Sequence, residues 1–276
     1  MPIEKSSRIL PESLSLRSVH LGRNVQVDLY WPPGLRTVPV DKGQVPGELS
    51  LLLINDGQDL VKLGLAELLD ELYDQAGLAP ILCVGIHAGP QRKMEYGTAV
   101  VRDFLGRGAM AGRYTAFVLE ELLPRLGEKS QFRDRAMAGF SLGALSAMDL
   151  VWNHPETFNR AGLFSGAFWW RAKDKDDPGY RDQTDRIMHR QVCEGSHHPG
   201  LRFFFECGTD DEREDRNNNG IIDSIDDTRD LIEELVAKGY DPEKDIRYLE
   251  IAGGRHDVAT WARAMPEFLR WGWGRP

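Results

Sequence analysis

The sequence has few of the features that mark disulfide-bonded or membrane-spanning proteins. Only three of its 276 residues are cysteines, an odd number too small for a disulfide framework, and their spacing is not that of a zinc site. The strongest apolar runs, at residues 51–54 and 203–205, are far shorter than the roughly 18 residues that a membrane-spanning helix needs. We therefore expect reduced thiols, a substantial core and no membrane segment.

Positive charge is also scarce. The chain has 34 Lys and Arg residues against 43 Asp and Glu residues, a net charge of −9, and no basic cluster. Because nucleic-acid binding needs a basic surface that neutralises phosphates, we expect no nucleic-acid partner. No apolar segment follows Lys5 near the N-terminus, so the sequence shows no secretory signal and predicts a cytoplasmic protein.

What the chain does contain is a regular alternation of apolar runs with amphipathic segments. Residues 15–20 and 24–31 alternate around a short turn, which predicts an antiparallel hairpin. Further strands are predicted at 50–55, 81–86, 135–140, 161–164, 201–206 and 246–251, helices at 61–76, 109–126, 142–152, 228–238 and 259–271, and a long polar loop at 165–200. This order predicts one α/β domain over residues 1–276, with a mainly parallel sheet, helices on both faces and an antiparallel N-terminal edge.

A Gly-x-Ser-x-Gly pentapeptide, Gly139 to Gly143, lies between a predicted strand and a predicted helix. The two glycines allow the sharp turn that raises a serine hydroxyl above the sheet at a helix N-terminus, as in the nucleophile elbow of a hydrolase. Ser141 is therefore the candidate nucleophile. The alternative is that Ser141 only caps the helix that follows it.

A serine nucleophile needs a histidine base and an acid that orients the imidazole. His256 is the candidate base, because it follows a strand on a glycine-rich loop before the last helix. The acid is expected after the strand that ends near residue 206, where Asp210, Asp211 and Glu212 are adjacent and sequence spacing does not separate them. The order serine, acid, histidine is that of the α/β-hydrolase fold.

Five motifs in the chain resemble those of esterases of the esterase D, feruloyl esterase and enterochelin esterase type, and the resemblance extends over roughly residues 20–272. The motifs are INDGQD, GFSLG, LFSGAFWW, ECGTDD and GGRHD. The resemblance implies an α/β-hydrolase fold and a serine carboxylic-ester hydrolase that needs no cofactor for catalysis. It also implies that Asp211, the second residue after the Gly-Thr pair, is the acid, with Asp210 as the alternative.

The same resemblance implies where the reacting carbonyl group binds. The backbone N–H groups of Gln58 and Leu142 would form the oxyanion hole, since preorganised amides stabilise the charge on the tetrahedral oxygen. Trp169 and Trp170 match an aromatic pair beside the substrate pocket, where at least one indole would contact an aromatic acyl group or a sugar ring. The alternative is that both tryptophans belong to the core.

These residues predict a small-molecule or carbohydrate ester as substrate, such as an aromatic-acid, sugar or siderophore ester, cleaved through an acyl-enzyme. An acyltransferase would use the same residues and differ only in the acceptor, so it stays open as an alternative. A non-catalytic carbohydrate-binding module is a third hypothesis, which the complete set of serine, histidine and acid disfavours. The sequence predicts neither the natural ester nor the oligomeric state.

An acidic segment before the fourth predicted helix needs a separate explanation. Residues 210–227 contain eight carboxylates and two arginines. With Gly220 at position 6, six residues match the ligand positions of a calcium-binding loop. They are Asp215, Asn217, Asn219, Ile221 through its backbone carbonyl, Asp223 and Asp226. The segment thus predicts a structural Ca²⁺ that orders the loop after Asp211, the alternative being a solvated Asn-Gly turn.

Overall fold

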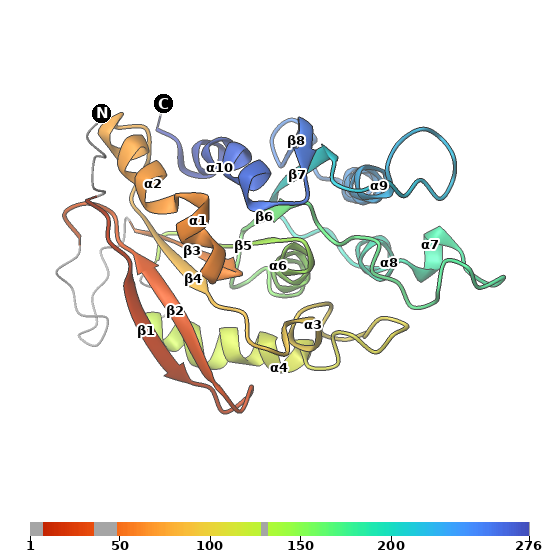
Figure 1. The fold of residues 1–276 in the computed structure, drawn as a ribbon, viewed down its shortest axis with the longest axis horizontal. Helices are drawn as coiled ribbons and strands as arrows, with labels where there is room; N and C mark the ends of the chain where they lie inside the picture. The colour runs from red at the N-terminus through yellow and green to blue at the C-terminus, as the bar shows by residue number, and fades with distance from the viewer. Residues whose placement is uncertain (1–7, 36–48, 128–131, 276) are drawn as a thin grey trace.

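The computed structural model describes residues 8–35, 49–127 and 132–275, and its centre is an eight-stranded sheet (Figure 1). The strands are Glu12–Arg17 (β1), Asn24–Tyr30 (β2), Ser50–Asn55 (β3), Ile81–Ile86 (β4), Arg135–Phe140 (β5), Arg160–Phe164 (β6), Arg202–Asp210 (β7) and Ile246–Arg255 (β8). Their order in the sheet is β1-β2-β4-β3-β5-β6-β7-β8. The pairs β1–β2 and β2–β4 are antiparallel and the other pairs are parallel. The predicted mainly parallel sheet with an antiparallel N-terminal edge is therefore confirmed.

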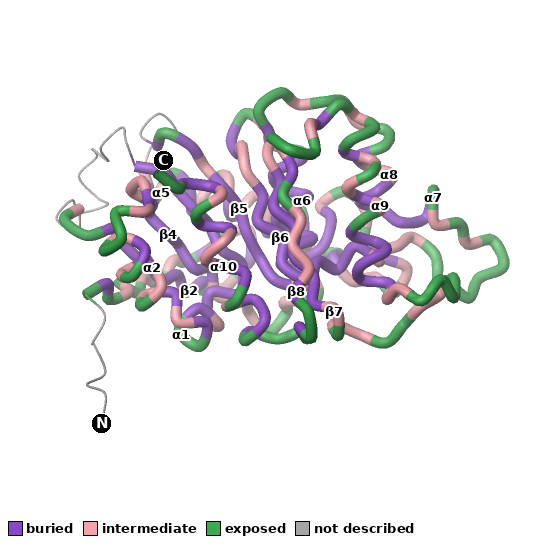
Figure 2. Tube along the Cα trace, turned by 90° about the horizontal axis from the view of Figure 1, so that it is seen from above, coloured by how far each residue is buried: buried purple, intermediate pink, exposed green. Residues whose placement is uncertain are grey.

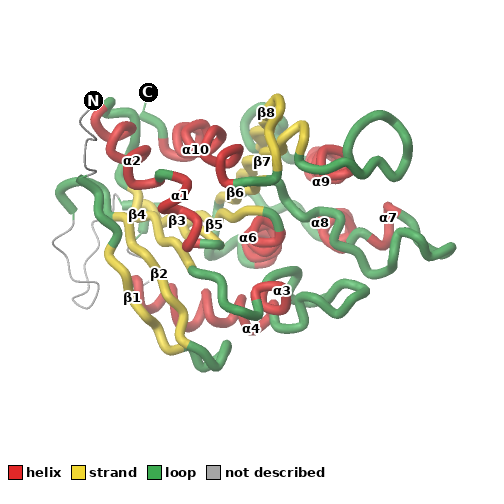
Figure 3. The backbone as a smooth tube through the Cα atoms, viewed as in Figure 1, coloured by secondary structure: helices red, strands yellow, loops and turns green. Residues whose placement is uncertain are grey.

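Helices cover both faces of the sheet (Figures 1 and 3). One face carries α1 (Leu60–Leu63), α2 (Leu65–Asp74) and α10 (Val258–Trp273). The other carries α4 (Ala111–Ala116), its π-helical continuation η3 (Phe117–Leu122), α5 (Leu123–Leu126), α6 (Leu142–Asn153), α8 (Ile187–Glu194) and α9 (Asp223–Lys238). The loops after β3, β4 and β6 contain the short elements η2 (Gly57–Asp59), α3 (Arg92–Glu95) and α7 (Asp182–Asp185). In the described part of the chain, no helix combines the length and apolar character needed to cross a membrane.

The alternation of side chains along each strand divides the core into two layers. On β3, Leu51 and Leu53 belong to the layer beneath α6, whereas Leu52 and Ile54 belong to the layer beneath α10. All four side chains are completely buried, which explains why a central strand reads as a continuous apolar run. Figure 2 shows the buried strands running through the middle of the molecule.

Two helices differ from the prediction by more than one or two residues at an end. The helix predicted at 61–76 is broken at Gly64, whose left-handed backbone, with a φ of 77°, ends α1 and precedes α2. The helix predicted from residue 228 begins at Asp223, so the last positions of the predicted calcium loop form its first turn. Helical periodicity reveals neither a break at a single residue nor the exact residue at which a helix begins.

The prediction of a continuous polar loop at 165–200 is wrong, because this segment contains α7 and α8. Ile187, Met188 and Val192 on α8 are buried in the core layer beneath α6. Polar neighbours in the sequence mask this short apolar face, and tertiary packing stabilises the helix.

The parallel strands all end at one edge of the sheet. The loops that leave this edge carry the candidate site residues: Ser141 follows β5, Asp211 follows β7 and His256 follows β8. The turn that precedes Gln58 follows β3. The parallel topology therefore brings these residues to one edge, as expected for a site in an open α/β sheet.

Candidate active site

Ser141 lies at the sharp turn between β5 and α6. Its φ of 56° and ψ of −122° form a backbone conformation that is kept only where the surrounding structure imposes it. Its N–H donates to the carbonyl of Phe164 on β6 at 2.9 Å. A Cβ on Gly139 would lie 2.4 Å from the backbone of Gly143, so the glycines allow the strand and the helix to touch. The turn has the geometry expected of a nucleophile elbow.

Asp211 and His256 are brought together from the loops after β7 and β8. The distance from Oδ2 of Asp211 to Nδ1 of His256 is 3.8 Å, which is close but longer than a hydrogen bond. The Asp211 side chain has no exposed surface, and neither of its oxygens has a hydrogen-bond partner among the described residues. Asp210 is exposed at the end of β7, where it pairs with Arg255 in the sheet register. The geometry therefore favours Asp211 over Asp210 as the partner of the imidazole.

The indole of Trp261 on α10 lies between the imidazole of His256 and the elbow. It packs edge-on against the indole with ring centroids 5.5 Å apart, and the indole stacks on Phe140 at 4.8 Å. Phe140 directly precedes Ser141, so two ring contacts join the loop of the candidate base to the elbow. The indole is held in place because its Nε1 donates to Oγ of Ser165 at 2.9 Å. Trp261 was not predicted, because in the sequence it reads as an ordinary apolar position of an amphipathic helix.

The two candidate oxyanion donors lie on adjoining segments. Gln58 is in η2, directly after β3, and Leu142 is the first residue of α6. Asn55 joins the two segments, since its Nδ2 donates to the carbonyl of Gly143 at 2.7 Å. The turn before Gln58 has a left-handed residue, Asp56, with a φ of 59°. These contacts hold the spacing between the two backbone segments that would carry the donors.

Arg92 clamps this turn to the elbow, and the sequence analysis missed it. Its guanidinium donates to both carboxylate oxygens of Asp56, at 2.6 and 2.7 Å, and to the carbonyl of Phe140 at 3.4 Å. The hydroxyl of Tyr96 accepts the backbone N–H of Asp56 at 3.2 Å. Burial raises the pKa of Tyr96 well above its ordinary value, so this hydroxyl stays neutral. Arg92 lies on α3, a single helical turn too short to show a periodicity.

Of the two neighbouring tryptophans, only Trp169 has appreciable exposed surface. Trp170 is completely buried, and its Nε1 donates to Oγ1 of Thr98 at 3.2 Å, so it is a core residue beneath the loop after β4. The segment lies against the elbow, because the N–H of Ala167 donates to the carbonyl of Ser141 at 3.2 Å. Trp169 is thus the member of the pair with exposed surface, and the guanidinium of Arg107 lies 4.8 Å from its ring centroid.

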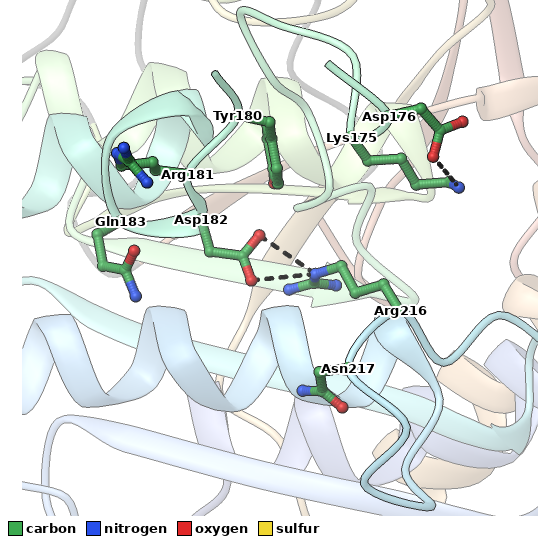
Figure 4. Close-up of a pocket in the computed structure, with 8 residues that line it drawn as sticks. All are labelled: Lys175, Asp176, Tyr180, Arg181, Asp182, Gln183, Arg216 and Asn217. Atoms are coloured by element: carbon green, nitrogen blue, oxygen red, sulfur yellow. Dashed lines mark hydrogen bonds and ion pairs between the residues drawn. The ribbon is translucent and has the colours of Figure 1, made fainter. Parts of the chain in front are cut away.

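Two cavities lie among the loops that follow the parallel strands. The first, of about 540 Å³, is lined by Pro90, Gln91, Arg92, Lys93, Met94 and Met110. The second, of about 440 Å³, is lined by Lys175, Asp176, Tyr180, Arg181, Asp182, Gln183, Arg216 and Asn217 (Figure 4). In the second cavity, Arg216 donates to both oxygens of Asp182 at 3.2 Å and also pairs with Asp223 and Asp227. Its charge is therefore already neutralised and is a poor anchor for an anionic substrate.

The predicted calcium loop forms a compact turn before α9. The two carboxylate oxygens of Asp215 accept backbone N–H groups from Asn219 at 3.1 Å and from Gly220 at 2.9 Å. The side-chain amides of Asn217 and Asn219 donate to the same oxygen of Asp226, at 3.0 and 2.7 Å. Hydrogen bonds therefore connect four of the six predicted ligands.

Of the other two predicted ligands, Ile221 also bonds within this set, whereas Asp223 bonds to Arg216. Asp223 accepts from the backbone N–H and the guanidinium of Arg216 at 2.9 and 3.2 Å, and the N–H of Ile221 donates to Asn219 at 2.8 Å. Across residues 8–35, 49–127 and 132–275, no group of three or more His, Cys, Asp or Glu side chains is close enough to hold a metal ion. Calcium binding by this loop stays a prediction.

Comparison with protein families gives one match over most of the chain. The model of the family described as "Putative esterase" matches residues 18–271. A search of curated proteins found no match.

Several solved structures are similar in fold. One is the enterobactin esterase FES from Shigella flexneri, crystallised with 2,3-di-hydroxy-N-benzoyl-glycine, which has 20% sequence identity and a TM-score of 0.69. The match covers 96% of this chain and 59% of the length of FES. A ferulic acid esterase has 17% sequence identity and a TM-score of 0.65, and the match covers 96% of this chain and 98% of that esterase. An IroE-like serine hydrolase from Shewanella oneidensis has 18% sequence identity and a TM-score of 0.66, and the match covers 95% of this chain and 79% of that hydrolase. At these identities the likeness shows a shared α/β-hydrolase fold.

Proposed function

This chain belongs to the esterase family whose model matches residues 18–271, and from that premise we propose that it is a serine esterase that cleaves carboxylic esters through an acyl-enzyme. The observation that carries the proposal is the strained turn at Ser141, together with the buried Asp211 facing His256 at the same edge of the sheet. A serine, an acid and a histidine, in this order along the chain, are the components that activate a hydroxyl as a nucleophile in an α/β-hydrolase.

In the proposed reaction, His256 acts first as general base and then as general acid. Its Nε2 takes the proton of Ser141 as the Oγ attacks the ester carbonyl carbon, and the same proton then passes to the leaving alcohol. Asp211 orients the imidazole through Nδ1, across a gap of 3.8 Å that would shorten once substrate is bound. A water molecule, deprotonated by His256, then attacks the acyl-enzyme and releases the carboxylic acid.

The negative charge that develops on the carbonyl oxygen would be met by the backbone N–H groups of Gln58 and Leu142. One such donor contributes about 2.7 to 4 kcal/mol to transition-state stabilisation, provided that it is already aimed at the oxyanion. The hydrogen bonds of Asn55 to the elbow and of Arg92 to Asp56 support this preorganisation, because they tie together the segments that carry the two donors.

For the substrate we propose a small-molecule or carbohydrate ester, with an aromatic-acid ester as the first class to test. The similar structures are named as an enterobactin esterase and a ferulic acid esterase. In this chain, the partly exposed Trp169 and the cavity beside Arg92, with Met94 and Met110 in its wall, support the same class, since they offer flat and apolar surface.

The nucleophile is tested with a fluorophosphonate probe and a short-chain aryl ester. We expect one label on the wild-type protein, and we expect Ser141→Ala to lose both the label and the hydrolysis, with turnover reduced by about 10⁵-fold. Ser15→Ala, at an exposed serine on β1, is the control and should behave as wild type. Full labelling of Ser141→Ala would show that another residue is the nucleophile.

A further inference from the structure

β7 contains a buried acidic residue, Glu206, that the proposed mechanism does not use. Glu206 has no exposed surface, and its carboxylate lies beside the N–H and hydroxyl groups of Ser165, which favour its ionised form. Neither carboxylate oxygen of Asp211 has a hydrogen-bond partner among the described residues. An ionised carboxylate that is buried without a partner is costly, and two of them in one place cost more.

The two carboxyl groups lie on the same side of β7. Side chains alternate along a strand, so Glu206 and Gly208 face the same way. A Cβ on Gly208 would lie 2.6 Å from Oδ1 of Asp211. The carboxylate of Asp211 therefore occupies the space that a side chain at position 208 would fill, next along the strand from Glu206.

The charged and titratable groups around Glu206 come from three elements and the loop after β7. On α10, Arg263 has the charge that favours an ionised Glu206. On β7, Cys207 faces the opposite side, and burial raises the pKa of its thiol well above the ordinary value, so it stays neutral. On β8, Glu250 is already engaged in an ion pair. Asp211 is the group whose charge opposes ionisation of Glu206.

Glu206 also lies at the end of a chain of contacts that begins at His256. The imidazole packs against Trp261, whose Nε1 donates to Oγ of Ser165 at 2.9 Å. Ser165, a neutral residue directly after β6, donates its N–H to the backbone carbonyl of Glu206 at 2.8 Å. Asp211, on the same side of β7 as Glu206, also faces Nδ1 of His256. The candidate base therefore has a neighbour of Glu206 on two sides, Asp211 on one and Trp261 with Ser165 on the other.

We infer that Glu206 is a positioning residue of the esterase site: its carboxyl group keeps its proton at neutral pH, so that no second negative charge lies beside Asp211 and turns it away from His256. This inference rests on the proposed function, because it takes Asp211 as the acid that orients the base. Two carboxyl groups that share a site do not both ionise readily, so one of them retains a proton.

The pH dependence follows from the loss of that proton. Burial, and next the charge of Asp211, raise the pKa of Glu206 to about 8. Above this pH a second anion appears beside Asp211, and repulsion turns that carboxylate away from the imidazole. Activity is therefore retained while Glu206 is protonated and falls as the pH rises through the pKa.

The test is the pH profile of kcat/KM with an aryl ester. We expect the wild type to be roughly tenfold less active at about pH 9 than at about pH 7, because one unit above the pKa about a tenth of the protein retains the proton. Glu206→Gln cannot ionise, so its ratio between the two pH values should be close to one. Glu250→Gln makes the same change on the neighbouring strand and should keep the wild-type profile.

A wild-type profile without this fall, or a fall that persists in Glu206→Gln, would overturn the inference. If Glu206→Gln does not fold, infrared spectra of the wild type replace it. They should show a protonated carboxyl band that disappears near the pKa of about 8 and at lower pH in Asp211→Asn, and its absence would equally overturn the inference. Activity that survives in Ser141→Ala would instead refute the proposed function, so the two failures are distinguishable.

Discussion

At the scale of single residues, Asp210 and Asp211 are chemically identical neighbours with opposite surroundings. Asp211 is buried and faces His256, whereas Asp210 is exposed. A buried carboxylate beside the imidazole sets its tautomer and stabilises the imidazolium, but an exposed one is screened by water.

Paired substitutions test this difference, because each removes the same charge. We expect Asp211→Asn to reduce kcat by about 10³ to 10⁴-fold, since the imidazole loses the charge that orients it. Asp210→Asn should stay within about threefold of wild type, as most exposed substitutions do. The measurement is kcat for an aryl ester, with the melting temperature as a check that both variants fold. The opposite ranking would show that Asp210 orients the base.

At the scale of elements, the loop before α9 joins the candidate acid to a helix that packs on the sheet. The carboxylates of Asp215 and Asp226 accept hydrogen bonds from within the loop. A calcium ion would replace these donors and offset the repulsion among the acids of residues 210–227. Position 12 is Asp rather than Glu, and two ligands are neutral Asn, so we expect weak binding.

Calcium should raise the melting temperature and a chelator should lower it, because an ion that binds only the folded state stabilises that state. At free calcium about 100-fold above the Kd, the expected rise is about 5 °C. The double substitution Asp215→Ala with Asp226→Ala should abolish the response, while the exposed Asp176→Ala should keep it. If neither calcium nor chelator changes the melting temperature or the activity, and no bound metal is detected, the loop is only a turn.

At the scale of the whole molecule, the strand order places Arg92 between two parts of the site. β3 lies between β4 and β5 in the sheet, so a side chain on the loop after β4 reaches Asp56 at the end of β3 and Phe140 at the end of β5. The bidentate contact needs a planar guanidinium, which a lysine does not provide. Arg92 is therefore expected to set the distance between the segments that carry the two candidate oxyanion donors.

We predict that Arg92→Lys lowers kcat by about 10 to 100-fold with little change in KM, because a misplaced donor stabilises the transition state less. Arg23→Lys is the matched control, since Arg23 makes a similar two-pronged contact with Glu95, on the same short helix, at 2.8 and 2.5 Å. Both variants should lose similar stability, measured by the melting temperature. Equal losses of kcat in the two variants would mean that Arg92 acts only through stability.

Features that depend on neighbouring residues along the chain could be predicted from the sequence. The buried strands read as apolar runs because both faces of the sheet are covered. The elbow at Ser141 was predictable because glycines at positions 139 and 143 are what a strand and a helix need in order to touch at a tight turn. His256 is predicted as the candidate base in the same way, from a glycine-rich loop between a strand and a helix, and the structure shows that loop directly after β8.

The packing of the chain distinguishes side chains that look alike in the sequence. Asp211 differs from Asp210, and Trp169 from Trp170, in burial and in contacts, and both are set by the elements packed around each residue. The contact of Arg92 with Asp56 joins residues 36 positions apart, on loops that meet because of the strand order. Such contacts depend on how distant segments pack against one another, and no local pattern in the sequence records them.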